Sequence, residues 1–207
     1  MKFNINNPKK LALLVIDMQN DFVKPDAPMC VPMATEAVPN ISKLITLCRE
    51  KGSTIIYTAH VHGKDRSDMG LMSDFWPPID SQEALVDNTY GADIYSALAP
   101  EKEDVLIKKH RYSAFYNTDL EHYLESKEID TLIITGTVTN MCCDSTARDA
   151  QFRDYKVIFV SDATGTMDHP DNGSGAMSTE KVQKATLTSL SFCVAEIAST
   201  QEVINKF

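Results

Sequence analysis

The chain has 207 residues, of which 43% are hydrophobic and 24% charged, and its net charge is −9. This composition is ordinary for a soluble globular protein. The negative charge argues against a nucleic-acid surface, which needs clustered Lys and Arg. The longest apolar run, Leu11 to Ile16, is far short of the roughly 20 residues that span a bilayer. Five cysteines without a pairing pattern and a polar first segment indicate the reducing cytoplasm.

The first predicted element is a strand over the continuous apolar run Leu11 to Ile16. Such a run favours a central strand of a parallel sheet that is covered on both faces. The strand ends at Asp17, and ligands of such sheets bind beyond the carboxyl ends of the strands, so Asp17 is a candidate acid or base. Alternatively, Asp17, Asn20 and Asp21 only form the turn. Helical spacing then predicts a helix over 34–51 that ends at Gly52.

A second predicted strand, Thr54 to Thr58, is followed by His60, His62 and Asp68, which are potential metal or substrate ligands. Two imidazoles that are two residues apart on an extended chain point the same way. The alternative is a polar loop in which His60 is hydrogen-bonded to a neighbour, because no further spacing completes a zinc signature.

Residues 63–93 form the longest stretch without a predicted element, and they include Phe75 and Trp76. A long loop in a compact domain often acts as a lid or as an oligomer contact. The two aromatic residues would then either cap a pocket or pack against a neighbouring subunit.

A third predicted strand, Val105 to Ile107, leads into a basic run that includes Lys109. A charge run usually forms a solvated face. Its position favours a functional role for Lys109, because a lysine at the carboxyl end of a strand would lie over the same sheet edge as Asp17.

The rest of the chain continues to alternate between strands and helices. Thr118 and Glu121 form a predicted capping box at the start of a helix. The remaining predicted elements are strands at 131–135 and 156–160, helices at 141–152 and 179–192, a loop at 167–178, an apolar segment at 193–198 and a short helix at 202–205. This alternation, without an internal repeat or linker, predicts one α/β domain over 1–207, a doubly wound α/β/α sandwich with a mostly parallel sheet.

Two adjacent cysteines, Cys142 and Cys143, fall where the strand at 131–135 turns into a helix. A helix N-terminus can lower the pKa of a thiol and can hold an oxyanion. Thiol-based acyl transfer needs a nucleophile of lowered pKa, a proton acceptor and oxyanion donors. Asp17 and Lys109 at two other strand ends would complete such a site.

Three segments, Leu14 to Phe22, Lys109 to Phe115 and Gly136 to Ala150, also resemble the isochorismatase-like cysteine hydrolases. That family includes nicotinamidases, N-carbamoylsarcosine amidohydrolase, and biuret and ureide hydrolases. The resemblance implies that Cys142 is the nucleophile, Asp17 its general base and later acid, and Lys109 the cation that stabilises the thiolate and orients Asp17. Cys143 stands where this family often has an aliphatic residue.

The resemblance also implies a cis peptide bond between Thr137 and Val138, an unusual linkage for a residue other than proline. The expected reaction is attack by the Cys142 thiolate on an amide or ureide carbonyl. The backbone N–H groups of Val138 and Cys142 would hold the oxyanion, and Asp17 would pass the proton to the leaving nitrogen.

The substrate is less constrained by the resemblance. The resemblance implies that a nicotinamidase would hold a metal through an Asp, a His two residues later and a further His. In this chain the corresponding residues are His60, His62 and Asp68, which is a different order of ligands. No metal or other cofactor is therefore expected. Siderophore-type isochorismatases of this fold look to lack the cysteine, so the presence of Cys142 argues against an activity of that type. The expected substrate is therefore a small linear amide, carbamoyl compound or ureide. The candidate pocket walls, which could equally be core, are Phe22, His60, Trp76, Tyr112 and Phe115. The resemblance further implies a homo-oligomer, either a dimer or a tetramer.

Three other functions remain open. The nearest is a nicotinamidase that acts on a cyclic carboxamide. The Cys142–Cys143 pair could instead serve a thiol redox protein. The chain could also be a catalytically silent binding module, although all three catalytic positions are filled.

Overall fold

The computed structural model describes residues 5–207, and its six strands form one parallel sheet. The strand order is β3-β2-β1-β4-β5-β6, and every neighbouring pair is parallel. The strands are β1 (Leu11–Ile16), β2 (Thr54–His60), β3 (Val105–Lys109), β4 (Thr131–Thr137), β5 (Lys156–Gly165) and β6 (Glu196–Ala198). The apolar β1 is buried along its whole length between β2 and β4, so the prediction of a covered central strand is confirmed.

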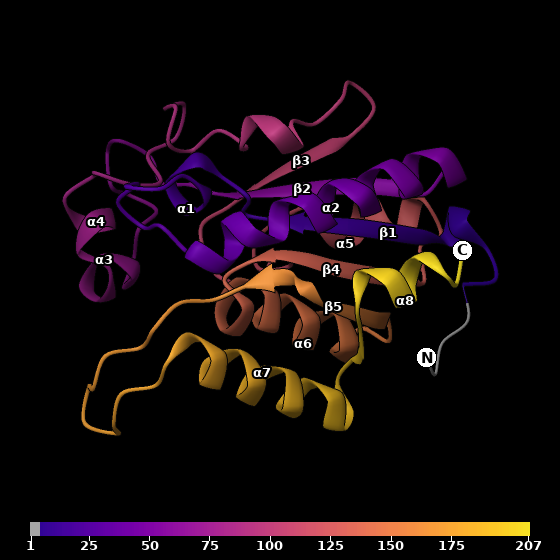
Figure 1. The fold of residues 1–207 in the computed structure, drawn as a ribbon. Coiled ribbons are helices and arrows are strands. Elements are labelled where there is room, and N and C mark those ends of the chain that lie inside the picture. Colours follow the sequence, from indigo (N-terminus) through magenta and orange to yellow (C-terminus); the bar gives the residue numbers. More distant parts are fainter. Residues whose placement is uncertain (1–4) are drawn as a thin grey trace.

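Helices cover both faces of the sheet (Figure 1), which confirms the doubly wound α/β/α sandwich. The helices are α1 (Asn20–Val23), α2 (Pro32–Lys51), α3 (Met72–Phe75), α4 (Pro77–Asp80), α5 (Leu120–Ser126), α6 (Asp144–Phe152), α7 (Thr179–Cys193) and α8 (Thr200–Ile204). Strand side chains alternate between the faces. Leu13 and Val15 of β1 therefore pack in the cluster with α2 and α8, whereas Leu14 packs in the cluster with α5, α6 and α7.

Helix α2 shows why the sequence signals for its ends are reliable. It begins at Pro32, two residues before the predicted start, because proline lacks an N–H and suits the first helical turn. It ends at Gly52, which adopts a left-handed φ of 71° and donates its N–H to the last turn, as predicted. Ile41, Leu44 and Cys48 form part of its buried stripe.

Three local predictions are corrected by the structure. The stretch 63–93 is not wholly irregular, since it contains α3 and α4. The capping box is wrong, because the N-cap position of α5 is taken by Asp119, whose side chain makes no capping bond, and the Glu121 carboxylate binds Arg153 instead. The predicted helix at 141–152 is split, because a π-helical turn over Thr139–Cys143 precedes α6. The cysteine pair thus lies in the π-helical turn after β4 and not in a regular first turn of α6.

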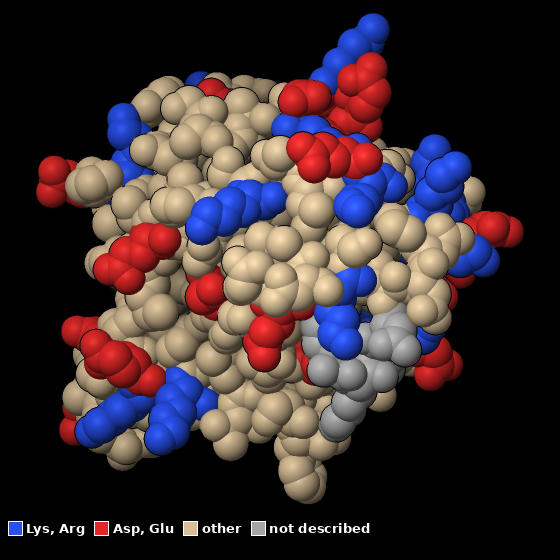
Figure 2. Space-filling model, turned by 45° about the vertical axis from the view of Figure 1, so that its right-hand side comes forward, with Lys and Arg blue, Asp and Glu red and all other residues tan. Residues whose placement is uncertain are grey.

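Two surface properties bear on function. Within residues 5–207, no helix is both long enough and apolar enough to cross a membrane. On the face drawn in Figure 2, basic and acidic side chains are interspersed and do not separate into large patches of one sign.

Candidate active site

The candidate site is a buried cluster beyond the carboxyl ends of three strands. Asp17 follows β1, Lys109 is the last residue of β3, and Cys142 lies in the turn after β4. The Lys109 Nζ lies 2.7 Å from the Asp17 Oδ2 and 3.3 Å from the Cys142 Sγ, and it donates to the Arg111 carbonyl at 3.0 Å. Because β2 separates β3 from β1 in the sheet, it is the length of the lysine side chain that joins the three strand ends.

Asp17 is held in place by its backbone as well as by Lys109. Its φ is +50°, an uncommon value for a residue other than glycine. The Thr58 hydroxyl donates to the Asp17 Oδ1 at 2.6 Å, and the Asp17 N–H donates to the Thr58 carbonyl at 3.2 Å. On the other side, a Cβ on Gly136 would lie 2.0 Å from the Ile16 carbonyl oxygen. Only glycine therefore permits this close approach of β4 to the end of β1.

The Cys142 thiol differs from the expected thiolate in one respect. Burial raises its pKa to about 12, with the Asp17 charge acting in the same direction and Lys109 opposing both. The prediction of a lowered pKa is therefore wrong, because the loss of solvation at this buried sulfur outweighs the neighbouring cation. The resting thiol is protonated at neutral pH.

The Lys109 ammonium remains charged in this buried position. Burial alone would lower its pKa, but the contacts with the Asp17 carboxylate and with the Cys142 sulfur outweigh that effect and raise it. The resting cluster of carboxylate, ammonium and neutral thiol has no net charge. Proton transfer from Cys142 to Asp17 would produce a neutral acid, an ammonium and a thiolate, and the net charge would again be zero. Such a transfer avoids the cost of leaving an uncompensated buried charge.

The two adjacent sulfurs have different surroundings. Cys142 lines the cavity described below, whereas Cys143 is fully buried and its Sγ lies 4.0 Å from the Thr135 carbonyl oxygen. Burial raises the pKa of Cys143 well above its ordinary value. The peptide bond between Thr137 and Val138 is cis, and Val138 also lines the cavity.

The cavity beside Cys142 has a volume of about 20 Å³ and a mostly apolar wall. Its lining residues are Phe22, Met29, His60, Met72, Trp76, Ile79, Leu85, Tyr112, Val138, Met141, Cys142 and Met167. Four predicted wall residues are therefore placed at the cavity: Phe22, His60, Trp76 and Tyr112. The fifth, Phe115, is not, because it is buried on the α5 and α6 face of the sheet, with its ring centroid 6.0 Å from that of Tyr155.

Several residues at the cavity carried no signal in the sequence. Four methionines from separate segments line the wall, and each resembles an ordinary core residue when taken alone. Gln19 was also missed, although it fixes the backbone of His60. The Gln19 Nε2 donates to the His60 carbonyl at 3.0 Å, and the His60 N–H donates to the Gln19 Oε1 at 2.8 Å. Gln19 is buried and lies in the segment Leu14 to Phe22. Its position just after the predicted strand is the signal that could have indicated a role at the site.

The two histidines at the end of β2 and just beyond it have different neighbours. Potential ligand atoms of His60 lie within 4.8 Å of those of Asp17 and Cys142, whereas those of His62 lie within 4.8 Å of those of Asp68 and His110. The candidate metal set of His60, His62 and Asp68 is therefore wrong. Strand geometry stops at His60, because the Val61 N–H still bonds to Lys109 but the His62 N–H bonds to the Leu85 carbonyl.

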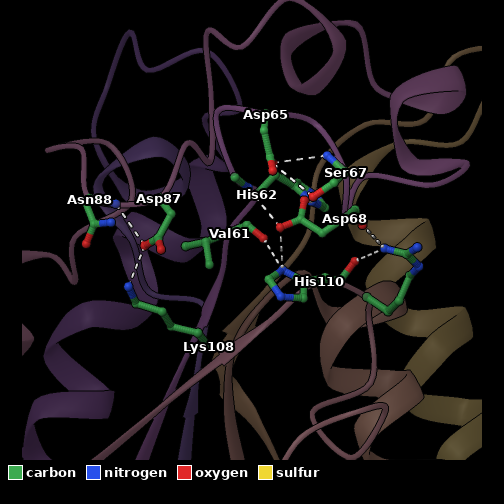
Figure 3. A network of polar contacts seen from close by, with 11 residues as sticks. Val61, His62, Asp65, Ser67, Asp68, Asp87, Asn88, Lys108 and His110 are labelled. Carbon is green, nitrogen blue, oxygen red and sulfur yellow. Dashed lines mark hydrogen bonds and ion pairs between the residues drawn. The ribbon is translucent and has the colours of Figure 1, made fainter.

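The second cluster, His62, Asp68 and His110, consists of potential metal ligands that lie in a network of polar contacts (Figure 3). The His62 Nδ1 lies 3.0 Å from the Asp68 Oδ1, and the His110 Nδ1 lies 2.7 Å from the Val61 carbonyl oxygen. The Gly63 N–H donates to the Asp68 Oδ2 at 2.9 Å. A divalent ion would suit the donor types, and the His62 Nε2 is buried without a partner among the described residues. At the His62 Nδ1, the Asp68 carboxylate and the His110 Nδ1, it would have to displace these protein partners. The contacts join the segment after β2 to the end of β3.

Comparison with known proteins places this chain in a family. The model of the isochorismatase domain matches residues 11–202. The chain is 30% identical to nicotinamidase 3 of Arabidopsis thaliana, over 95% of this chain and 88% of the relative. It is 37% identical to an isochorismatase of Bacillus subtilis, over 77% of this chain and 49% of the relative. The chain thus spans about half the length of that Bacillus protein.

Two further likenesses concern amidase and thiol chemistry. N-carbamoylsarcosine amidase of an Arthrobacter species is 33% identical over 79% of this chain and 62% of the relative. The crystal structure of a cysteine hydrolase from Pseudomonas syringae is 40% identical, with a TM-score of 0.93, and it covers 97% of this chain and 93% of that one. The chain thus shares the α/β fold of a cysteine hydrolase. The chain belongs to the isochorismatase family.

Proposed function

We propose that this protein is a cysteine amidohydrolase, which cleaves the C–N bond of a small linear amide, N-carbamoyl compound or ureide and releases ammonia or an amine. The observation that carries the proposal is the Lys109 ammonium, which contacts both the Asp17 carboxylate and the Cys142 sulfur inside the fold. Thiol acyl transfer needs a nucleophile and a proton acceptor in such an arrangement. The names of two relatives, a nicotinamidase and an N-carbamoylsarcosine amidase, support amide substrates.

In the proposed first half-reaction, Asp17 takes the proton of the Cys142 thiol as the sulfur attacks the substrate carbonyl carbon. Because the thiol is protonated at rest, deprotonation and attack are coupled. The backbone N–H groups of Val138 and Cys142 would stabilise the oxyanion of the tetrahedral intermediate. The intermediate collapses when the C–N bond breaks and the proton moves from Asp17 to the leaving nitrogen. The products are an amine or ammonia and a thioester on Cys142.

In the second half-reaction, Asp17 takes a proton from water, and the resulting hydroxide adds to the thioester carbonyl. The C–S bond then breaks, the acid leaves, and the proton on Asp17 returns to the Cys142 sulfur. Lys109 remains an ammonium throughout and offsets whichever of its two neighbours is anionic. No metal or other cofactor takes part in the proposed reaction.

The proposal is tested by an ammonia-release screen over primary amides, N-carbamoyl compounds, biuret and related ureides, with Cys142→Ala as the blank and Cys143→Ala as the matched control. We expect the wild type and Cys143→Ala to release ammonia from the same substrate and Cys142→Ala to release none. Turnover that survives in Cys142→Ala but not in Cys143→Ala would contradict the assignment.

The structure bears differently on the alternatives from the sequence. Cys143 is fully buried and does not line the cavity beside Cys142, which disfavours a redox-reactive pair because reactive cysteines are partly exposed. A nicotinamidase-type activity on a cyclic carboxamide is a second candidate, favoured by the aromatic side chains of Phe22, Trp76 and Tyr112 in the cavity wall. The substrate screen therefore includes nicotinamide.

We further propose a homo-oligomer, either a dimer or a tetramer, in the cytoplasm. Exposed aromatic side chains support association, since Phe75 is 74% and Phe192 is 87% exposed. The free state of all five cysteines supports a reducing compartment. Light scattering coupled to size exclusion would test the assembly, and a monomeric mass at micromolar concentration would contradict it.

A further inference from the structure

The wall of the cavity beside Cys142 carries no acidic or basic side chain that could bind a substrate charge. Of its twelve lining residues, all of which lie within residues 5–207, none is Lys, Arg, Asp or Glu. His60 is its one basic group, and burial together with the Lys109 charge holds the pKa of His60 well below its usual range. The Lys109 and Asp17 charges beneath the sulfur already neutralise each other at 2.7 Å. An ionic substituent that contacts only this wall would therefore find no counterion.

The wall is also deformable. Met29, Met72, Met141 and Met167 approach the cavity from four different segments. Methionine is unbranched and adapts its shape to what it contacts. The cavity of about 20 Å³ is large enough for about one water molecule. An acyl group must therefore enter by displacing apolar side chains, and this favours a group that itself gains from leaving water.

The hydrogen-bonding capacity of the wall is small and neutral. The His60 Nε2 is buried and has no partner among the described residues. The Gln19 side chain holds the His60 backbone on both sides. The Tyr112 hydroxyl accepts from the Trp76 Nε1 at 2.9 Å. A neutral imidazole near the nucleophile can bond to an uncharged amide group, but it cannot balance a carboxylate.

We propose that this pocket selects an uncharged carboxamide with a branched or aromatic hydrocarbon acyl group, and that His60 hydrogen-bonds the amide being cleaved. This inference rests on the proposed amidohydrolase function and narrows its substrate class. It excludes N-carbamoyl amino acids and other anionic amides as good substrates, because a carboxylate buried without a partner is strongly unfavourable.

The first test compares matched amides by ammonia release. In 4-methylpentanamide an isopropyl group replaces the carboxylate of succinamate, and in benzamide a C–H replaces the ring nitrogen of nicotinamide. We expect kcat/KM for 4-methylpentanamide to exceed that for succinamate by roughly 100-fold or more, and benzamide to exceed nicotinamide by a smaller factor. Equal or better cleavage of succinamate would overturn the pocket inference while leaving the amidohydrolase function intact.

A second readout does not require any amide to be cleaved. Iodoacetamide and iodoacetate alkylate thiols and differ mainly in charge, and the exposed Cys193 gives the reference ratio in the same molecule. We expect the ratio of iodoacetamide to iodoacetate rates at Cys142 to exceed that at Cys193 by at least about tenfold. If this holds but no amide is cleaved, the proposed function fails and the pocket inference stands. Equal ratios at the two cysteines would overturn the inference.

A designed cation sharpens the same test. Met167→Lys would place an ammonium in the cavity wall. Met177→Lys is the control, because Met177 lies in the loop before α7 and does not line the cavity. We expect Met167→Lys to raise the iodoacetate rate at Cys142 by about tenfold or more relative to iodoacetamide, and Met177→Lys to leave the ratio within about twofold. An equal response to both substitutions would show that the wall does not set the charge preference.

Discussion

Two histidines that are two residues apart illustrate how differently this fold uses the same side chain. His60 ends β2 in the apolar cavity beside Cys142, and its Nε2 has no partner among the described residues. His62 is bound to Asp68 at 3.0 Å in a polar network that secures the segment after β2. Burial lowers the pKa of both imidazoles, so both favour the neutral form. Each ring has an Nε2 atom that is buried without a partner among the described residues. The His62 Nδ1 is bound to Asp68, and only the ring of His60 lies in the cavity beside the nucleophile.

The largest effect on turnover is expected from substitution of Cys142, the proposed nucleophile beside His60. Cys142→Ala should reduce turnover by about 10⁴-fold or more, because the acyl intermediate cannot form. Cys143→Ala should keep turnover within about tenfold, since that sulfur faces Thr135 and not the cavity. Ammonia release by the two purified variants provides the measurement. A loss of similar size in Cys143→Ala, with the fold intact by circular dichroism, would remove the distinction between the sulfurs.

Asp17→Asn is expected to separate the reactivity of the thiol from turnover. Amide cleavage should fall by about 10²–10⁴-fold, because the proton acceptor and donor is lost. The Asp17 charge helps raise the pKa of Cys142 to about 12, so the thiol of the variant should ionise at lower pH. The rate of Cys142 alkylation, measured from pH 7 to 10, should therefore rise earlier in Asp17→Asn than in the wild type. An unchanged profile would show that Asp17 does not act on this sulfur.

Lys109→Met tests the charge balance beneath the cavity. It leaves the buried Asp17 carboxylate without its ammonium partner, and we expect the free energy of unfolding to fall by about 3–5 kcal/mol. The double variant Asp17→Asn/Lys109→Met should recover part of that loss and remain inactive. Denaturant unfolding at pH 7 measures both. If the double variant were less stable than the single one, the ion pair would not be the source of the cost.

The two histidines should respond to substitution in different measurements. His60→Phe should lower kcat/KM by roughly 10–100-fold with little change in stability, because an imidazole that hydrogen-bonds the substrate is lost. His62→Asn should instead lower the free energy of unfolding by about 1–3 kcal/mol, because Asp68 loses its partner, with a smaller effect on kcat/KM. Reversed outcomes would indicate that the free ring nitrogen of His60 is not used.

Removal of metal ions should have the smallest effect. The His62 Nδ1, the Asp68 carboxylate and the His110 Nδ1 are bound to one another or to backbone groups, and the proposed reaction uses no ion. Dialysis against a strong chelator is expected to change turnover by less than about twofold. A loss that is restored by zinc or another divalent ion, and that is abolished by His110→Gln, would show that this network is a metal centre.

Strong local patterns made most of the fold predictable. The apolar run of β1, the glycine after α2 and the strand–helix alternation all depend on neighbouring residues, and each was confirmed. The capping box failed because Glu121 found Arg153, a partner 32 residues away in the chain. Tertiary contacts of this kind override a local motif without leaving a mark in the sequence.

The site was predictable only where the end of a strand fixes a residue. Asp17, Lys109 and the Cys142–Cys143 pair were found in this way, the family resemblance then selected Cys142, and the structure brings Asp17, Lys109 and Cys142 together. The methionine wall was missed because its members come from four segments, and the divergence of His60 and His62 depends on a bond to Leu85 in the long loop. The raised pKa of Cys142 follows from complete burial, which a favourable position at a turn does not reveal.

The central claim, that Cys142 forms the acyl intermediate, is tested most directly by trapping that intermediate. The protein would be mixed with p-nitrophenyl 4-methylpentanoate, quenched in acid within milliseconds to seconds, and mapped by tandem mass spectrometry. We predict one acyl group on Cys142 in the wild type and in Cys143→Ala, and none at this site in Cys142→Ala. An acyl group on Cys143, or no acyl group while p-nitrophenolate is released in an initial burst, would contradict the account.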